Sequence, residues 1–242
     1  MNQNNRGRTN GLPPHISKAF SGPDTNPNNS DSPFERLADE YDAWFDGEGR
    51  LIFKIETCGF QEILPSLPEP WIEIGVGSGR FAAALGIDTG LEPSRNLGRM
   101  SQLRGIKVTR ARGEDRVFPQ RSFGTAFIIV TLCFLDDPSL VLRRTWEMLK
   151  DHGKLVLGLI TRESPWARFY LGKKEEGHPF YSIASFYGYV EVLGLLREAG
   201  FSHERTISTL FQAPGQVEHM ELPREGFLPY AGFLIMVAGK LP

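Results

Sequence analysis

The stretch WIEIGVGSGRFAAALG, residues 71–86, combines a carboxylate with three closely spaced glycines. Glu73 lies in the short apolar run WIEI, and Gly75, Gly77 and Gly79 follow at alternate positions. Glycine has no Cβ, so such a loop lets a ligand approach the backbone closely. A carboxylate at the mouth of the loop disfavours a pyrophosphate, because both are negative. It favours a ligand that carries an ammonium or sulfonium group.

The spacing of the glycines distinguishes this loop from the dinucleotide-binding fingerprint G-x-G-x-x-G. The third glycine of that fingerprint packs a helix against a strand. Counted from Gly75, it would fall at position 80, where this chain has Arg80. The pattern here is E-x-G-x-G-x-G, which counts against an NAD(P)-dependent oxidoreductase without removing that alternative.

A second carboxylate, Glu92, ends the next predicted strand. In an open α/β sheet, ligands bind outside the carboxyl ends of the strands. A carboxylate there can accept hydrogen bonds from both hydroxyls of a ribose. The alternative is a surface residue that precedes a Pro-Ser turn, in which Ser94 caps a helix.

Strands and helices alternate after residue 70, which predicts a mostly parallel sheet with helices on both faces. The expected strands are 71–74, 87–92, 105–111, 122–135, 154–160, 205–212 and 230–239, and the expected helices are 80–86, 94–103, 137–152 and 185–199. The run 122–135 is apolar throughout, as is typical of a strand buried on both faces. Asp137 and Pro138 provide a helix start, and Gly153 and Gly200 are expected to follow helix ends.

The regions outside this alternation are predicted to have separate roles. Residues 1–32 are rich in Asn, Gly, Pro and Ser and are expected to be disordered, and residues 33–242 to form a single domain. Apolar spacing predicts a helix over 33–45, capped by Ser32, and another over 51–64, so that residues 33–66 form lid helices. A connector over 162–184 is expected on the substrate side.

Bulk properties exclude several classes of protein. The chain has 242 residues, a formal net charge of −2 and 40% hydrophobic residues, which gives no electrostatic attraction to nucleic acid or anionic membranes. No apolar run reaches the ~18 residues of a membrane span, and the N-terminus lacks the apolar region of a secretory signal. The two cysteines, Cys58 and Cys133, have no metal-binding spacing. We therefore expect a cytoplasmic protein without a metal, nucleic-acid or membrane partner, as a monomer or weak homodimer.

Several motifs together resemble a known family. IEIGVGSGRF, GLEPS, GEDRVFPQRSFGTAFI, TLCFLDDP and LKDHGKLVLG are similar to the class I S-adenosylmethionine-dependent methyltransferases, with the type 11, UbiE-like domain as the closest group. The resemblance covers about residues 34–240 and is strongest over 71–158. It implies a Rossmann-like α/β fold with a seven-stranded sheet in the order 3-2-1-4-5-7-6, the last strand antiparallel. It also implies S-adenosylmethionine as cofactor and methyl transfer to a small-molecule acceptor.

The resemblance implies roles for particular residues. Glu73 would reach the amino-acid part of the cofactor, Glu92 would hold the ribose, and Gly113 with Glu114 would lie along the adenine. The remaining residues that it places around the cofactor are Tyr41, Gly75, Val76, Gly77, Pro93, Thr131, Leu132 and Cys133. Two positions depart from the family pattern: Arg112 replaces a common aspartate near the adenine, and Gly124 replaces an aspartate before the fourth strand. The adenine amino contact would then pass to backbone or to Glu114, and the change at Gly124 would be one of local packing.

Substrate contacts are expected from the first lid helix and from the connector. Aromatic residues gather in both segments, and aromatic rings at such a site can face a cationic sulfur or amine. The candidates are Trp44, Phe45, Tyr170, Phe180 and Tyr181. The alternative is that these rings only seal the edge of the core.

No catalytic residue is evident from the sequence. Methyl transfer from a sulfonium needs a base only when the acceptor must lose a proton. His178 is the one candidate base, and its alternative is a loop histidine before proline. A non-enzymatic module that binds the cofactor is the remaining hypothesis, and it predicts cofactor binding without turnover.

Overall fold

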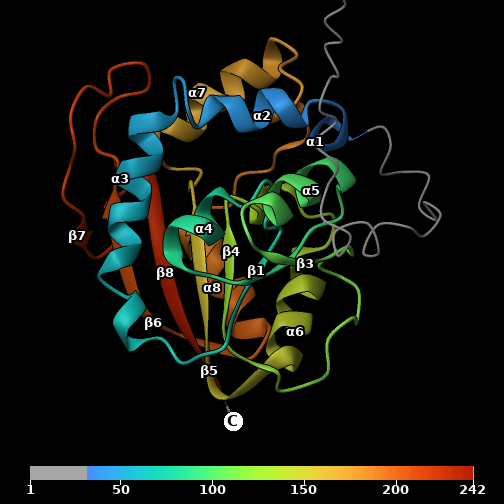
Figure 1. The fold of residues 1–242 in the computed structure, drawn as a ribbon. Helices are drawn as coiled ribbons and strands as arrows, with labels where there is room; N and C mark the ends of the chain where they lie inside the picture. Colours follow the sequence, from blue (N-terminus) through green and yellow to red (C-terminus); the bar gives the residue numbers. More distant parts are fainter. Residues whose placement is uncertain (1–31, 242) are drawn as a thin grey trace, which may run out of the picture.

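The computed structural model describes residues 32–241 and contains one mixed sheet (Figure 1). Its strands are β1 (Trp71–Ile74), β2 (Thr89–Leu91), β3 (Lys107–Thr109), β4 (Phe123–Ile129), β5 (Leu149–Leu159), β6 (Phe201–Thr209), β7 (Arg224–Glu225) and β8 (Phe233–Lys240). The spatial order is β3-β2-β1-β4-β5-β8-β6-β7. Strands β1 to β5 run parallel, and β8 is antiparallel to both β5 and β6.

The predicted α/β fold class is confirmed, and one strand was missed. The expected order 3-2-1-4-5-7-6 is present, but the two-residue strand β7 adds an eighth member at the edge. It pairs with Ile207 and Ser208 of β6. Both residues of β7, Arg224 and Glu225, are exposed and charged, so the sequence has no apolar pattern there to indicate a strand.

Helices cover both faces of the sheet. On one face, α3 (Arg50–Gln61) and α4 (Arg80–Leu85) pack over a core that includes Phe60 and Phe127. On the other face, α6 (Pro138–Met148) and α8 (Tyr189–Glu198) pack over Ile72 and Ile128. Helix α5 (Arg95–Leu103) packs beside β3. All seven residues of β4 are buried, as expected for a strand at the centre of the sheet, but the strand expected over 122–135 ends at Ile129, and Leu132–Phe134 form a short 3-10 helix instead.

The helix starts follow the predicted caps. The side chain of Ser94 accepts a hydrogen bond from the backbone of Leu97, and that of Asp137 accepts one from Leu140. The predicted end of α6 was wrong, because the helix ends at Met148 rather than before Gly153. The intervening residues belong to the irregular start of β5, where His152 has a φ of +61°.

The lid and the connector also differ from expectation. The helix expected over residues 33–45 is interrupted at Leu37, which separates α1 (Pro33–Arg36) from α2 (Ala38–Trp44). The connector contains a helix, α7 (Pro165–Glu175), which is capped by Ser164. Short 3-10 helices complete the chain: η1 (Leu64–Ser66), η2 (Leu132–Phe134) and η3 (Tyr181–Ile183).

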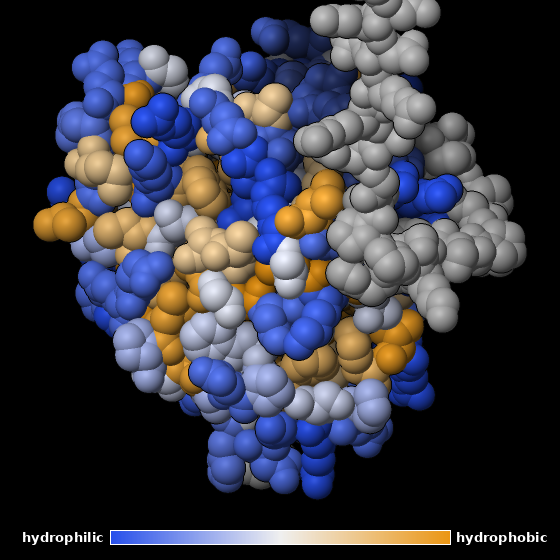
Figure 2. All heavy atoms as spheres, viewed as in Figure 1, coloured by the Kyte–Doolittle hydropathy of each residue, from blue (hydrophilic) through white to orange (hydrophobic). Residues whose placement is uncertain are grey.

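Figure 1 shows α1, α2 and α7 lying over one end of the sheet, where the parallel strands have their carboxyl ends. Figure 2 shows hydrophilic side chains over much of this view, with apolar residues in separate patches. None of the helices in residues 32–241 is long and apolar enough to cross a membrane. Residues 1–31, expected to be disordered, and residue 242 lie outside the described part of the chain.

Candidate active site

The glycine loop connects the end of β1 to the start of α4. Gly75, Gly77 and Gly79 have φ angles of +72°, +54° and +83°. Residues with a Cβ rarely adopt this left-handed region, so the conformation accounts for the glycines. The backbone N–H groups of Gly75 and Val76 donate hydrogen bonds of 2.8 and 3.0 Å to the carbonyl oxygen of Leu91. The loop is thereby fixed to the end of β2.

The glycine loop also lies directly against Thr131, which follows the end of β4. A Cβ placed on Gly75 would lie 2.7 Å from Oγ1 of Thr131. The Thr131 hydroxyl donates to the carbonyl oxygens of Gly75 and Ile129, at 3.2 and 2.9 Å. The carboxyl ends of β1, β2 and β4 therefore meet around the loop.

Glu73 has a buried oxygen atom with no partner. The residue is 2% exposed, and its Oε2 accepts no hydrogen bond from any described residue. Burial, followed by the nearby negative charge of Glu92, raises its pKa well above the ordinary value. A buried carboxyl oxygen without a hydrogen-bond partner destabilises the folded state unless a ligand donates a hydrogen bond to it. A cationic group is the natural partner.

Glu92 joins the glycine loop to the following turn. Its two oxygens accept hydrogen bonds from the backbone N–H groups of Gly77 (2.9 Å) and Ser94 (2.8 Å). Burial raises its pKa to about 7, and the two N–H donors oppose that shift. Each carboxylate oxygen has a further lone pair, so hydroxyl groups can still be accepted.

Tyr41 of α2 covers the loop from the lid side. A Cβ placed on Gly77 would lie 3.7 Å from both Cε1 and Oη of Tyr41. Burial, then the charges of Glu92 and Glu73, raises the pKa of the Tyr41 hydroxyl far above its usual range. The tyrosine therefore remains neutral beside the two carboxylates.

Ion pairs hold α2 in this position. Asp42 accepts hydrogen bonds from Arg80 at the start of α4 and from Arg104 at the end of α5, at 2.8 and 2.7 Å. Burial alone would raise the pKa of Asp42, but the hydrogen bonds from Arg80 and Arg104 outweigh it and lower the value to about 2. Arg80, which occupies the position where a dinucleotide fingerprint has glycine, thus joins α4 to α2.

The predicted adenine contacts lie around Arg112. Its guanidinium pairs with Asp136 and with Glu114, the latter at 3.4 Å. The other carboxyl oxygen of Glu114, Oε1, is buried and has no partner among the described residues. Gly113 is tightly enclosed, since a Cβ there would lie 3.0 Å from Val141. The departure at Arg112 therefore places an ion pair beside Glu114 and leaves one Glu114 oxygen available.

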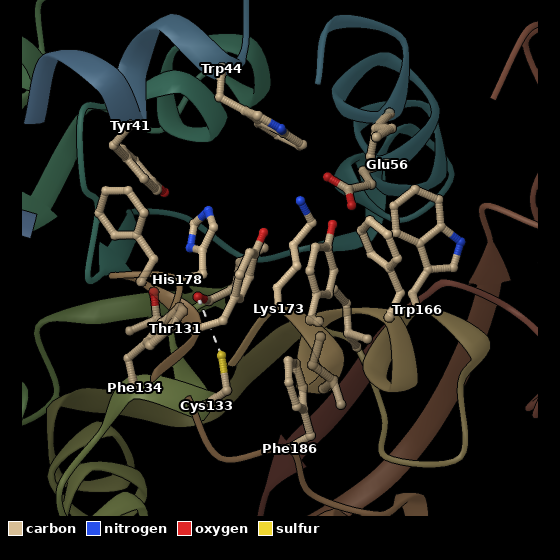
Figure 3. Close-up of a pocket in the computed structure, with 18 of the residues that line it drawn as sticks. Tyr41, Trp44, Glu56, Thr131, Cys133, Phe134, Trp166, Lys173, His178 and Phe186 are labelled. Carbon is tan, nitrogen blue, oxygen red and sulfur yellow. Dashed lines mark hydrogen bonds between the residues drawn. The ribbon is translucent and has the colours of Figure 1, made fainter. Parts of the chain in front are cut away.

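A cavity of about 400 Å³ lies beside the glycine loop, under the lid helices and α7 (Figure 3). Ten of the predicted site residues line it: Tyr41, Trp44, Phe45, Thr131, Leu132, Cys133, Tyr170, His178, Phe180 and Tyr181. The others do not: Glu73, Gly75, Val76, Gly77, Glu92, Pro93, Gly113 and Glu114. The predicted residues therefore divide into a group around the loop and a group that lines the cavity, which we name the cofactor region and the acceptor cavity after their predicted roles. Tyr41 and Thr131 belong to both.

Aromatic rings form most of the cavity wall. Tyr170 and Tyr181 stack with ring centroids 4.3 Å apart, and Tyr41 and Phe180 lie 5.7 Å apart. Phe45 is largely engaged elsewhere, because it is 6% exposed and packs edge-on against Phe81 in the core. Its contact with the substrate stays a prediction.

The two candidate reactive side chains differ in character. Burial raises the pKa of Cys133 to about 12, so the residue is a neutral thiol rather than a nucleophilic thiolate. Burial, then the charge of Lys173, lowers the pKa of His178, and its Nδ1 is buried without a partner. The imidazole is consequently neutral near pH 7 and can accept a proton.

Among the lining residues that were not predicted are Phe34, Glu56 and Phe134. Glu56 had a signal in the sequence: it follows Ile55 and lies four residues after Ile52 on the apolar face of α3. Phe34 and Phe134 become neighbours only when distant segments fold together.

Comparisons with known proteins agree with this geometry. A methyltransferase-domain family model matches residues 72–157. An uncharacterised protein of Mycobacterium tuberculosis is 38% identical over 205 residues, which cover 84% of this chain and 72% of the relative. An uncharacterised protein of Methanocaldococcus jannaschii is 34% identical over 208 residues, covering 86% and 98%.

A solved structure has the same fold. It is a Thermotoga maritima protein described as a "SAM-dependent methyltransferase, possible histamine N-methyltransferase". It is 34% identical, with a TM-score of 0.79, and the match covers 86% of this chain and 98% of that one. The chain therefore belongs to the S-adenosylmethionine-dependent methyltransferases, and S-adenosylmethionine is its cofactor. The donor set fits this ligand, since the unpaired Glu73 oxygen suits an ammonium group and the glycines permit close approach.

Proposed function

We propose that the protein is an enzyme that transfers the methyl group of S-adenosylmethionine to a small-molecule acceptor in the cavity under α1, α2 and α7. One observation carries the proposal: the cavity adjoins the glycine loop through Tyr41 and Thr131, which touch both. An acceptor in the cavity would thus lie next to a cofactor on the loop. Aromatic, mostly apolar cavities of this size are typical of small-molecule sites.

Different residues of the chain would bind different parts of the cofactor. Glu73 would hold the ammonium group of the cofactor, Glu92 the ribose, and Glu114 the amino group of the adenine. The backbone of Val76 and the ring of Pro93 would border the cofactor, while Leu132 and Cys133 would close the floor of the cavity. The Val76 side chain itself packs in the core, where a Cβ on Gly90 would lie 2.6 Å from its Cγ1.

The bound sulfonium cofactor supplies an activated methyl group, so the protein has to align the reactants and exclude water. The lid serves both requirements. Tyr41 and Phe180 close the cavity beside the loop, and the Asp42 ion pairs keep α2 in place. His178 is the side chain suited to take a proton from an acceptor, because its ring lies in the cavity wall and is neutral near pH 7.

The test is methyl transfer with S-adenosylmethionine carrying a deuterated methyl group, followed by mass spectrometry of an acceptor panel. The panel contains amines, imidazoles, phenols, thiols and carboxylic acids, with histamine included because of the Thermotoga relative. We expect a product three mass units heavier than the unlabelled methylated compound, and a more than tenfold slower reaction with Glu73→Gln. Cofactor binding with no product across the panel would favour a non-enzymatic binding module instead.

A further inference from the structure

Glu56 is a buried carboxyl group that the described protein does not pair. It lies in the middle of α3 and is 5% exposed. No hydrogen bond or ion pair joins it to any residue between 32 and 241, and burial raises its pKa to about 8. Figure 3 shows its carboxyl group directed into the cavity.

Folding gives no reason for this carboxyl group. Its neighbours on the same face of α3 are Ile52, Ile55 and Phe60, which are buried and apolar. A buried acid without a partner destabilises the folded state, and an apolar side chain would not carry that cost. The group is therefore explained by something that enters the cavity.

The surroundings of Glu56 favour a cation. Trp44, Trp166 and Tyr170 contribute rings to the same cavity, and aromatic faces attract cations. The ionisable residues that line it are Glu40, Glu48, Glu56, Lys173, His178 and the cavity tyrosines. Carboxylates thus outnumber the single ammonium group, that of Lys173, which lies 5.0 Å from the centroid of the Phe169 ring. Figure 3 shows the Lys173 side chain directed toward Glu56, but no ion pair joins the two residues.

The position of Glu56 relative to the cofactor region restricts its role. Tyr41 and Thr131, which contact the glycine loop, lie on one side of the cavity in Figure 3, and Glu56 lies on the other with Trp166. A group held by Glu56 is therefore remote from the atom that receives the methyl group. His178 lies nearer to the Tyr41 side.

We propose that Glu56 binds a cationic amino group of the acceptor, and that this acceptor carries its methyl-accepting atom at the opposite end, near Tyr41 and Thr131. The inference rests on the proposed function and specifies the acceptor class: a compact amine with an aromatic or apolar body and a second, nucleophilic group. Glu56 takes part in binding only, and the amino group that it holds keeps its protons.

The test uses two matched pairs of probes that differ only in charge. Tyramine is compared with tyrosol, and histamine with 4-(2-hydroxyethyl)imidazole, by calorimetric titration into the protein saturated with S-adenosylhomocysteine. We expect at least one amine to bind tenfold or more tightly than its alcohol. In Glu56→Gln that preference disappears, while the alcohol binds within twofold of wild type. The exposed Glu62→Gln at the end of the same helix, outside the cavity, serves as control and retains the preference.

Three results would overturn the inference: equal binding of amine and alcohol, no amine binding at 1 mM, or a charge preference that survives in Glu56→Gln. A methyl group on the primary amine of a product would also contradict the two-ended arrangement. Failure of the proposed function is distinguishable, because S-adenosylhomocysteine would then not bind, or no acceptor would be methylated. Glu56→Gln should bind S-adenosylhomocysteine as wild type does, and an unchanged or higher Tm shows that it folds. Glu56→Leu provides a second variant with the same expected loss.

Discussion

The cofactor region and the acceptor cavity adjoin each other but are built differently. The cofactor region uses backbone geometry and carboxylates from neighbouring parts of the sequence, as in the Glu92 bonds to Gly77 and Ser94. The cavity is assembled from side chains of the lid, α3, α7 and the end of β4, and its wall is aromatic. The first can be specified by a short motif, whereas the second depends on how distant segments pack. Each prediction below alters one of the two regions.

The largest effect on binding is expected from Glu92→Ala. The substitution leaves the backbone N–H groups of Gly77 and Ser94 without their acceptor and removes the predicted ribose contact. We expect the affinity for S-adenosylhomocysteine to fall about 100-fold, or about 2.7 kcal/mol, by isothermal titration calorimetry. Asp88→Asn, an exposed carboxylate paired with Lys107 ahead of β2, is the control and should change binding less than twofold. Equal losses in both variants would contradict the assignment of Glu92.

Gly75→Ala tests the contact between the glycine loop and the end of β4. Both Gly75 and Gly86 have positive φ, but a Cβ at Gly75 meets Thr131 whereas one at Gly86 meets nothing within 4 Å. Alanine should cost about 1 kcal/mol at Gly86 from backbone strain alone, and about 1–2 kcal/mol more at Gly75 from the clash. Urea unfolding of the two variants measures the difference. Equal losses in the free energy of unfolding at the two positions would mean that the glycine loop shifts to accommodate a Cβ at Gly75 without cost.

A third effect concerns stability and depends on pH. Because the pKa of Glu56 is raised to about 8 in the folded state, the unfolded chain releases this proton first as pH rises. Glu56 therefore lowers the free energy of unfolding progressively from about pH 4.5 to pH 8, and no further above that. Glu56→Gln removes this dependence, so its advantage over wild type should grow across that range.

At pH 8 the gain in Glu56→Gln should be up to about 4 kcal/mol, because each pH unit between the ordinary pKa and the folded-state pKa of about 8 contributes about 1.4 kcal/mol. The raised pKa values of Glu73 and Glu92 are present in both proteins and cancel in the comparison. Thermal unfolding at pH 5 and pH 8 provides the measurement. A variant that is less stable than wild type at pH 8 would show that Glu56 has a structural partner.

The two regions also differ in what the sequence could predict. The glycine spacing, Glu73 and the cap at Ser94 follow local rules, so β1, the loop and α5 were found close to their observed bounds. Strand β4 was expected at the centre of the sheet from its apolar run, and all of its residues are buried. Roles for these residues toward the cofactor remain predictions.

The acceptor side was harder to predict, for physical reasons. No glycine or proline marks the break between α1 and α2 at Leu37. Helix α7 lies in a segment that was predicted to be a connector without a helix. Glu56 was overlooked because an acidic residue on an apolar helix face gives no indication of what it faces. Glu56 shares the cavity with Trp166 and Tyr170 because α3 and α7 both border it, although β1 to β5 lie between these helices in the sequence.

The most direct measurement is thermal unfolding of wild type, Glu92→Ala and Glu56→Gln with S-adenosylhomocysteine and, in parallel, NADPH. At 100 times the dissociation constant, a ligand stabilises by about 2.7 kcal/mol, which raises Tm by roughly 5–10 °C in a chain of this size. We predict that rise with S-adenosylhomocysteine alone, equal in wild type and Glu56→Gln, and strongly reduced in Glu92→Ala. An equal rise with NADPH, no rise in wild type, or a loss confined to Glu56→Gln would contradict a cofactor region separate from the acceptor cavity.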